Sequence, residues 1–189
     1  MIAAGIGVLT GLISSLPSPL PDLKLDEPEI LVSAERVPLH AGIAFGAGVA
    51  LIVWLWASRD PGKCLLALVL TLIGWLAAVN TANDVLLVTV SSELFGTEPG
   101  AKESREVLGL VLGGIAAGAV GAGLTAFGAG IAAESVRRVE AWAPVVGAGA
   151  VFGFLLYPAV SNETIALLLL PWQAAVAAAL ANALTLQRS

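Results

Sequence analysis

Charged side chains are scarce in this chain. Of its 189 residues, 12% are charged and 58% are hydrophobic, and the mean hydropathy is +0.92. A soluble globular domain carries roughly 25% charged residues. The charges that are present gather in short stretches between long apolar runs, which is the pattern of a protein that crosses a membrane several times. We therefore predict an all-α, polytopic transmembrane helix bundle rather than a soluble fold.

Cysteine and histidine are each present only once. Cys64 has no second cysteine with which to form a disulfide inside the chain. His40 has no second histidine with which to build a bis-histidine haem site or a His-rich metal site. The apolar runs also lack a serine–histidine pair, paired aspartates and an HExxH motif. We therefore expect a non-catalytic protein without a cofactor and without a metal.

The net charge of −5 makes a nucleic-acid partner unexpected, because binding to phosphates needs a basic patch and the sequence has none. The bilayer itself is the expected environment. The abundance of Ala, Gly, Leu and Val, together with more arginine than lysine, is typical of a prokaryote with a GC-rich genome. The predicted location is therefore the plasma (inner) membrane of a prokaryotic cell.

Six apolar runs are candidates for membrane spans, namely residues 1–16, 39–57, 64–90, 107–133, 143–160 and 165–187. The last five are near or above the roughly 20 residues that a span needs. The first is only about 24 Å long as a helix and is either a retained helix or a signal peptide. It has no Lys or Arg near its start and no A-x-A site, which favours the retained helix. We predict one integral membrane domain, 1–189, with six spans, or five if residues 1–16 do not span.

The loops predict the orientation. If the N-terminus is cytoplasmic, the inner segments are residues 58–63, 134–142 and the C-terminal tail. They are short, yet they hold five of the nine basic residues, which are Arg59, Lys63, Arg137, Arg138 and Arg188. Most of the acidic residues fall in the longer outer segments. Because basic residues concentrate in cytoplasmic loops, both termini are predicted to be cytoplasmic.

The first outer segment, residues 17–38, is rich in proline and acidic residues and is predicted to lie outside the membrane. Its early prolines favour extended backbone. Its later part, residues 29–36, is either a short interfacial helix or a plain linker.

The clearest motif is the glycine-rich run GLVLGGIAAGAVGAGLTAFGAGIAAE at 109–134, which predicts a central, glycine-rich helix. Glycine is a poor helix former in water, but small residues let membrane helices approach closely. At 100° per residue the small residues of this run share one face, and GxxxG spacings recur in two other spans. These packing candidates are Gly114, Gly118, Gly121, Gly128, Gly42, Gly46, Gly149 and Gly153. The small face is expected to meet either a helix of its own bundle or a second copy of the chain.

A polar cluster interrupts the third apolar run in the sequence AVNTANDVLLV, residues 78–88. Asn80, Asn83 and Asp84 share one helical face. They lie about 24 to 30 Å along the helix from Cys64 at the inner surface, and therefore in the outer leaflet or at the interface. One interpretation is a helix end whose side chains satisfy backbone groups. The other is an outer vestibule or partner contact beneath residues 17–38.

The last span holds a second polar set. Pro171 removes a backbone hydrogen bond and is expected to kink the helix. This predicts a cavity beside Trp172, Gln173 and Asn182. The alternative is an ordinary kinked helix whose glutamine bonds a neighbour.

No span carries a continuous polar stripe, which a pore inside one protomer would need. We therefore predict a non-catalytic multi-pass membrane protein that serves as a subunit or scaffold of a larger or oligomeric membrane complex. It would pack through its small-residue faces against further copies or other membrane subunits. The alternative is a channel or passive transporter for an ion or a small neutral solute, because polar residues within spans often mark functional sites. Its lining would be Asn80, Asn83, Asp84, Gln173 and Asn182.

Overall fold

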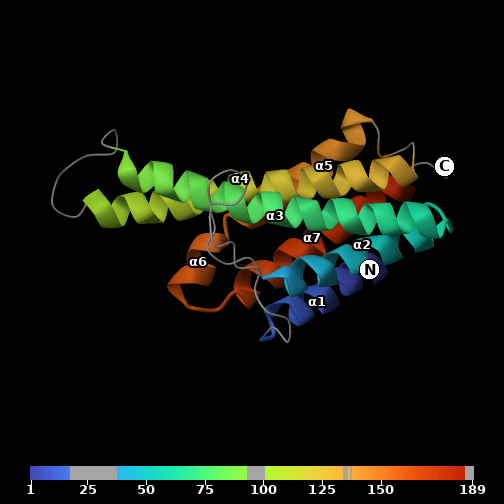
Figure 1. Ribbon diagram of the computed structural model, residues 1–189, viewed down its shortest axis with the longest axis horizontal. Coiled ribbons are helices and arrows are strands. Elements are labelled where there is room, and N and C mark those ends of the chain that lie inside the picture. Colours follow the sequence, from blue (N-terminus) through green and yellow to red (C-terminus); the bar gives the residue numbers. More distant parts are fainter. Residues whose placement is uncertain (18–37, 93–100, 134–135, 137, 186–189) are drawn as a thin grey trace.

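The computed structural model describes residues 1–17, 38–92, 101–133, 136 and 138–185, and that part of the chain contains helices and no strand (Figure 1). This confirms the predicted all-α bundle. The helices are α1 (Ile2–Ser15), α2 (Leu39–Trp56), α3 (Pro61–Ser91), α4 (Ala101–Ala132), α5 (Val139–Gly153), α6 (Leu156–Ser161) and α7 (Ala166–Thr185). Residues 18–37, which include the stretch 29–36 proposed as an interfacial helix or a linker, lie outside the described residues.

The chain is a multi-pass membrane protein. Five segments are long and apolar enough to cross a membrane, namely α2, α3, α4, the α5–α6 pair and α7, while α1 is apolar but only 14 residues long. The outer surface of the bundle is also apolar. Leu9, Leu65 and Val151 are each about 60% exposed or more, as suits side chains that face lipid tails.

The long helices pack as a closed ring. From α1 to α5 each helix packs against the next, α5 packs against α7, and α7 completes the ring by packing against α1. The beginning of α1 and the ends of α2 and α7 meet at one end, where Met1, Trp56 and Thr185 line the same hollow. The core of buried branched side chains, which includes Val49, Ile52, Val145, Val176 and Leu180, lies between α2, α5 and α7.

The turn between α2 and α3 shows how the sequence ends one helix and begins the next. Asp60 caps α3, because its Oδ1 atom accepts hydrogen bonds from the backbone N–H groups of Gly62 at 2.8 Å and Lys63 at 3.4 Å. Pro61 occupies the first helical position, where its missing N–H costs nothing and its fixed φ suits the helix. This is the tight turn that the sequence SRDPG predicts.

The interpretation of Asn80–Asp84 as a helix end is wrong, because α3 continues without a break to Ser91. The polar side chains form hydrogen bonds to backbone carbonyls of the same helix. Asn80 Nδ2 donates to the Leu76 carbonyl at 2.8 Å, and Thr81 Oγ1 donates to the Ala77 carbonyl at 2.8 Å. Hydrogen bonds to a carbonyl one turn earlier leave the backbone ladder intact. Helices α3 and α4 therefore form a hairpin of 31 and 32 residues, about 46 to 48 Å long.

The predicted span 143–160 is not one continuous helix. Helix α5 ends at Gly153, a turn follows, and the short α6 begins at Leu156. Pro158 lies inside α6 and has no N–H to donate to the carbonyl four residues earlier, so the helix cannot run on through this point with its full set of bonds.

The small face of α4 packs inside the protomer. Gly114 lies directly against Gly153 of α5, and Gly118 against Gly149, so close that a Cβ atom on any of the four would collide with backbone of the facing helix. On the neighbouring side, α4 packs against α3. A Cβ atom on Gly121 would lie 3.2 Å from the Cβ of Ala78. Of the two partners left open by the sequence, the structure uses helices of the same bundle.

The other glycine pairs serve different contacts. Gly42 and Gly46 of α2 lie against α3, where a Cβ on Gly46 would come within 3.0 Å of the Leu68 carbonyl oxygen. They do not meet the small face of α4. A further glycine pair with the same spacing, not among the predicted packing candidates, lies in α1. These glycines, Gly7 and Gly11, lie against the backbone of α7 around Leu170 and Gln173. Glycine spacing thus predicts close approach but not which helix approaches.

The contact between α4 and α5 provides a stability test. Gly118→Ala is expected to lower the free energy of unfolding by about 1–3 kcal/mol, because the added methyl group forces the two backbones apart. Gly147→Ala is the matched control on α5, since a Cβ there meets nothing within 4 Å; its effect should stay within about 0.5 kcal/mol. Unfolding by SDS titration in mixed micelles measures both. Equal effects of the two substitutions would contradict the packing of α4 on α5.

Candidate functional site

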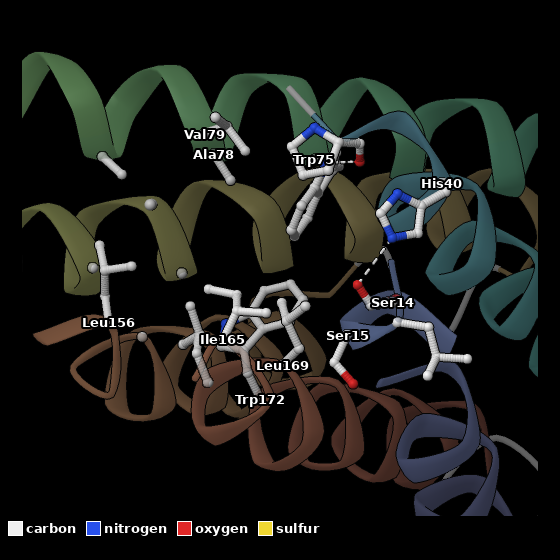
Figure 2. Close-up of a pocket in the computed structure, with 18 residues that line it drawn as sticks. Ser14, Ser15, His40, Trp75, Ala78, Val79, Leu156, Ile165, Leu169 and Trp172 are labelled. Carbon is white, nitrogen blue, oxygen red and sulfur yellow. Dashed lines mark hydrogen bonds between the residues drawn. The ribbon is translucent and has the colours of Figure 1, made fainter. Parts of the chain in front are cut away.

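A cavity of about 360 Å³ lies near the first residues of α2 and α7, away from the hollow at Trp56 and Thr185 where these two helices end (Figure 2). Its walls come from α1, α2, α3, α4, α6 and α7, with one residue from the end of α5. Most of the lining is apolar. It comprises Trp75, Ala78, Val79, Ala82, Gly114, Ala117, Gly118, Gly153, Leu156, Ile165, Leu168, Leu169 and Trp172, together with Leu16 and Pro38, and Ser14, Ser15 and His40 are its polar members.

The hollow exists because the helices present small side chains there. Ala78 of α3 and Ala117 of α4 leave space that larger residues would fill. The two indoles that flank the space are held in place by hydrogen bonds. Trp75 Nε1 donates to the Pro38 carbonyl at 3.2 Å, and Trp172 Nε1 donates to the Gly149 carbonyl at 3.0 Å. The cavity is therefore built with fixed aromatic walls.

A polar network closes one end of the cavity and joins three helices. Gln173 Nε2 of α7 donates to Ser14 Oγ of α1 at 3.0 Å. Ser14 Oγ donates in turn to the Ala41 carbonyl of α2 at 3.2 Å. His40 Nε2 donates to the Ser14 carbonyl at 3.1 Å. Because a carbonyl oxygen can only accept, Nε2 of His40 carries a proton.

Two buried atoms of this network have no hydrogen-bond partner among the described residues. They are His40 Nδ1 and Gln173 Oε1. Buried polar atoms in native proteins are almost always bonded, so each exception calls for an explanation. His40 lines the cavity, whereas Gln173 does not. The Nδ1 atom of His40 is itself buried, so it is not exposed to the space of the cavity.

The three residues of the predicted cavity do not form one site. Trp172 lines the cavity. Gln173 is fully buried and bonds Ser14 rather than facing the space. Asn182 is exposed near the other end of α7, where it lines a second hollow together with Met1 and Trp56. The alternative of a glutamine that bonds a neighbouring helix describes Gln173 correctly.

The polar cluster of α3 does not face the cavity either. Asn80 and Asn83 are half-buried and Asp84 is exposed. At 100° per residue, Asn80 and Asp84 lie on the opposite side of α3 from the cavity residues Trp75 and Ala82. They belong to the outward stripe of the helix. Of the segment predicted to cover them, residues 18–37 lie outside the described part of the chain.

Several residues of the site carry no direct signal in the sequence. Ser14 and Ser15 stand at the end of the short first run, and nothing in their spacing connects them to Gln173, which is 159 residues away from Ser14. His40 stood out only as the single histidine. Trp75 has the position of an ordinary lipid-facing aromatic residue. Only Trp172 was found, through its place beside Pro171.

The side chains of Ser14 and His40 bond backbone oxygens and not each other. The imidazole of His40 bonds the backbone oxygen of Ser14, while the hydroxyl of Ser14 donates to a different carbonyl. That hydroxyl therefore has no base in position to activate it. Within the described residues, no three His, Cys, Asp or Glu side chains come together. The site offers apolar contact and a few hydrogen bonds.

Comparisons of the chain with protein-family models, with curated proteins and with solved structures give no match. The length and apolar composition of its helices identify the chain as a multi-pass membrane protein.

The polar network predicts a specific pattern of stabilities. Ser14→Ala removes the partner of a fully buried amide and is expected to cost about 1–3 kcal/mol. Ser15→Ala is the matched control, because the Ser15 hydroxyl bonds only the Leu12 carbonyl of its own helix, at an exposed position; it should cost less than about 0.5 kcal/mol.

The double variant Ser14→Ala/Gln173→Leu should recover much of the loss, since it removes both polar partners together. SDS titration in mixed micelles measures all three variants. If Ser14→Ala is no worse than Ser15→Ala, the network does not stabilise the bundle.

Proposed function

We propose that the protein is a non-catalytic subunit of a larger membrane complex and that another subunit docks on the outer face of the α3–α4 hairpin. We define this docking face by the outward residues Asn80, Asp84, Leu87 and Val88 of α3. The observation that carries the proposal is the order of charged and apolar side chains along this face.

Along α3, the charged residue Asp84 comes before the apolar residues Leu87 and Val88. Asp84 is exposed, and one turn nearer to the tip of the hairpin Leu87 and Val88 are 56% and 67% exposed. If the membrane boundary lies beyond Val88, the carboxylate of Asp84 faces lipid, which is costly. If the boundary lies at Asp84, two large apolar side chains face water. A protein partner that covers the whole face removes both costs.

The length of the hairpin places this face within reach of a partner. Helices α2 and α7 have 18 and 20 residues, or about 27 and 30 Å, which matches the roughly 30 Å hydrocarbon core. Helices α3 and α4 are longer by half or more, and Figure 1 shows their common end extending past the other helices. Leu87 and Val88 of the docking face lie in the last turns of α3, toward this common end.

The chemistry of the face indicates the kind of partner. Its apolar residues suit an apolar helix, and Asp84 suits a Lys or Arg on that helix, because a charge covered by protein needs an opposite charge or hydrogen bonds. A second copy docked symmetrically on the same face would bring two Asp84 carboxylates toward each other. A different chain is therefore the better partner.

The small-residue faces do not supply this contact. They are occupied by packing between α4, α3 and α5, and between α1 and α7. The proposal therefore moves the contact from the glycine faces to the hairpin. The excess of basic residues in the inner segments supports cytoplasmic termini, and the composition rich in Ala, Gly, Leu and Val supports the plasma membrane of a prokaryote.

A channel or passive transporter has less support. Asn80 and Asp84 point away from the interior of the bundle, and Gln173 is engaged with Ser14. Asn182 lies at the other end of α7. The polar residues that would line a pore thus share no common path through the protomer.

Site-specific photo-crosslinking in cells tests the docking face. A photoreactive phenylalanine analogue at Val88 is expected to form a product with a different protein of defined mass. The control position is Leu9 of α1, which is 59% exposed on an apolar helix of the bundle and should give no discrete protein product.

In addition, Asp84→Ala should reduce the amount of partner that co-purifies in mild detergent by about tenfold or more, because it leaves the partner's charge unpaired.

The possible outcomes separate the alternatives. A product between two copies of this chain would replace the foreign subunit with a homo-oligomer. The absence of any protein product at Val88, with equal co-purification of wild type and Asp84→Ala, would contradict the proposal.

A further inference from the structure

The side chains that line the cavity have no hydrogen-bond donor to spare. Five lining residues in the described part of the chain carry a side-chain N–H or O–H group, and each group already donates to a backbone carbonyl. These residues are Ser14, Ser15, His40, Trp75 and Trp172. The second ring nitrogen of His40, Nδ1, is buried. Apart from the serine hydroxyl oxygens at one side of the space, the side chains of the wall therefore offer only apolar contact (Figure 2).

Such a wall suits hydrocarbon better than water or an ion. A buried water molecule typically makes about three hydrogen bonds, and the donors that it would need are already engaged. The lining residues of the described chain include no Asp, Glu, Lys or Arg, so an ion would lose its hydration without gaining a partner. Ala78, Ala117 and Leu156 are typical of the surface that remains. An apolar chain has no hydrogen bond to lose when it enters this space.

The cavity lies at the depth of lipid tails. Its residues on α3 run from Trp75 to Ala82, about 16 to 27 Å along the helix from Cys64 near the start of α3. The hydrocarbon core is about 30 Å thick, so the cavity lies in the half of the core that is farther from the turn between α2 and α3. Leu16 and Ile165, which line it after the end of α1 and just before α7, are 60% and 43% exposed. The cavity is therefore partly open at the level where lipid tails join their head groups.

The volume fits one lipid chain and not two. A methylene group takes up about as much space as a water molecule in the liquid, roughly 30 Å³. A cavity of about 360 Å³ thus has room for about a dozen carbon atoms of a chain. The indoles of Trp75 and Trp172, which flank the space, are fixed by hydrogen bonds to backbone carbonyls. They give the chain a rigid wall on either side.

We propose that the cavity binds one acyl chain of a membrane phospholipid. The chain lies along the alanine and glycine residues of α3 and α4, between Trp75 and Trp172. The head group stays outside the bundle, at the opening beside Leu16 and Ile165. This site is on the opposite side of α3 from the docking face, so it does not depend on the proposed subunit contact.

Photo-labelling of the full chain in vesicles tests the proposal. The vesicles consist of phosphatidylcholine with a small fraction of the same lipid that carries a diazirine in the middle of one acyl chain. Trp172 is only 6% exposed, so lipid on the outer surface of the bundle does not reach it, whereas a chain inside the cavity does. Peptide mapping by mass spectrometry is expected to find the label on Trp172. Leu167 of the same helix is 45% exposed and does not line the cavity, so it reports labelling by the surrounding lipid.

A pair of α4 variants locates the site. Ala117→Phe fills the cavity and is expected to lower the labelling of Trp172 at least tenfold, while the labelling of Leu167 stays as in wild type. Ile115→Phe is the matched control, because Ile115 is on the opposite side of α4, is 38% exposed and does not line the cavity. Its labelling of Trp172 should equal that of wild type. If Ala117→Phe does not fold, Ala82→Leu blocks the same space from α3.

Three results would overturn the proposal. Label on Leu167 without label on Trp172 in the wild type would mean that no lipid chain enters the cavity. Undiminished labelling of Trp172 in a folded, cavity-filled variant would mean that lipid reaches this indole by another route. Labelling of Trp172 by a free diazirine fatty acid, but not by the diazirine phospholipid, would replace the membrane lipid with a free acid as the ligand.

Discussion

The structure depends on direct contact between the backbones of α4 and α5. Inside a bilayer, lipid tails are as apolar as leucine, so helices associate through close packing rather than through exclusion of water. Gly114 and Gly118 meet Gly153 and Gly149 with no side chain between them. This contact fixes the middle of the ring. The positions of α3 on one flank of α4, and of α7 beside α5, follow from it.

The same glycines explain why a hollow lies beside so tight a contact. Gly114, Gly118 and Gly153 also line the cavity, because a residue without a side chain leaves empty space wherever the facing helix turns away. Helix α5 turns away after Gly153, where α6 begins. The glycine residues therefore both allow α4 and α5 to approach closely and leave the pocket open beside them. Rigid indoles then give the pocket its walls.

Much of the fold could be predicted from the sequence, but little of the site. Long apolar runs and clustered charges identify the spans, and Asp60 with Pro61 marks the turn before α3. The continuation of α3 past Asp84 was left open by the sequence, because asparagine and threonine can either end a helix or bond to the carbonyls of a helix that continues. The partner of Ser14 was not visible either, since spacing along a chain says nothing about contacts across 159 residues. Glycine spacing predicted close packing in general, while the facing helix depends on the whole ring.

The bond between Ser14 and Gln173 has a consequence for how the protein is made. Helix α1 is about 21 Å long, shorter than the hydrocarbon core, and it carries Thr10 and Ser14 on its buried side. Its main packing partner, α7, leaves the ribosome last among the described helices. During synthesis, Ser14 can bond α2 before α7 is made, and it gains the amide of Gln173 only when α7 packs against α1.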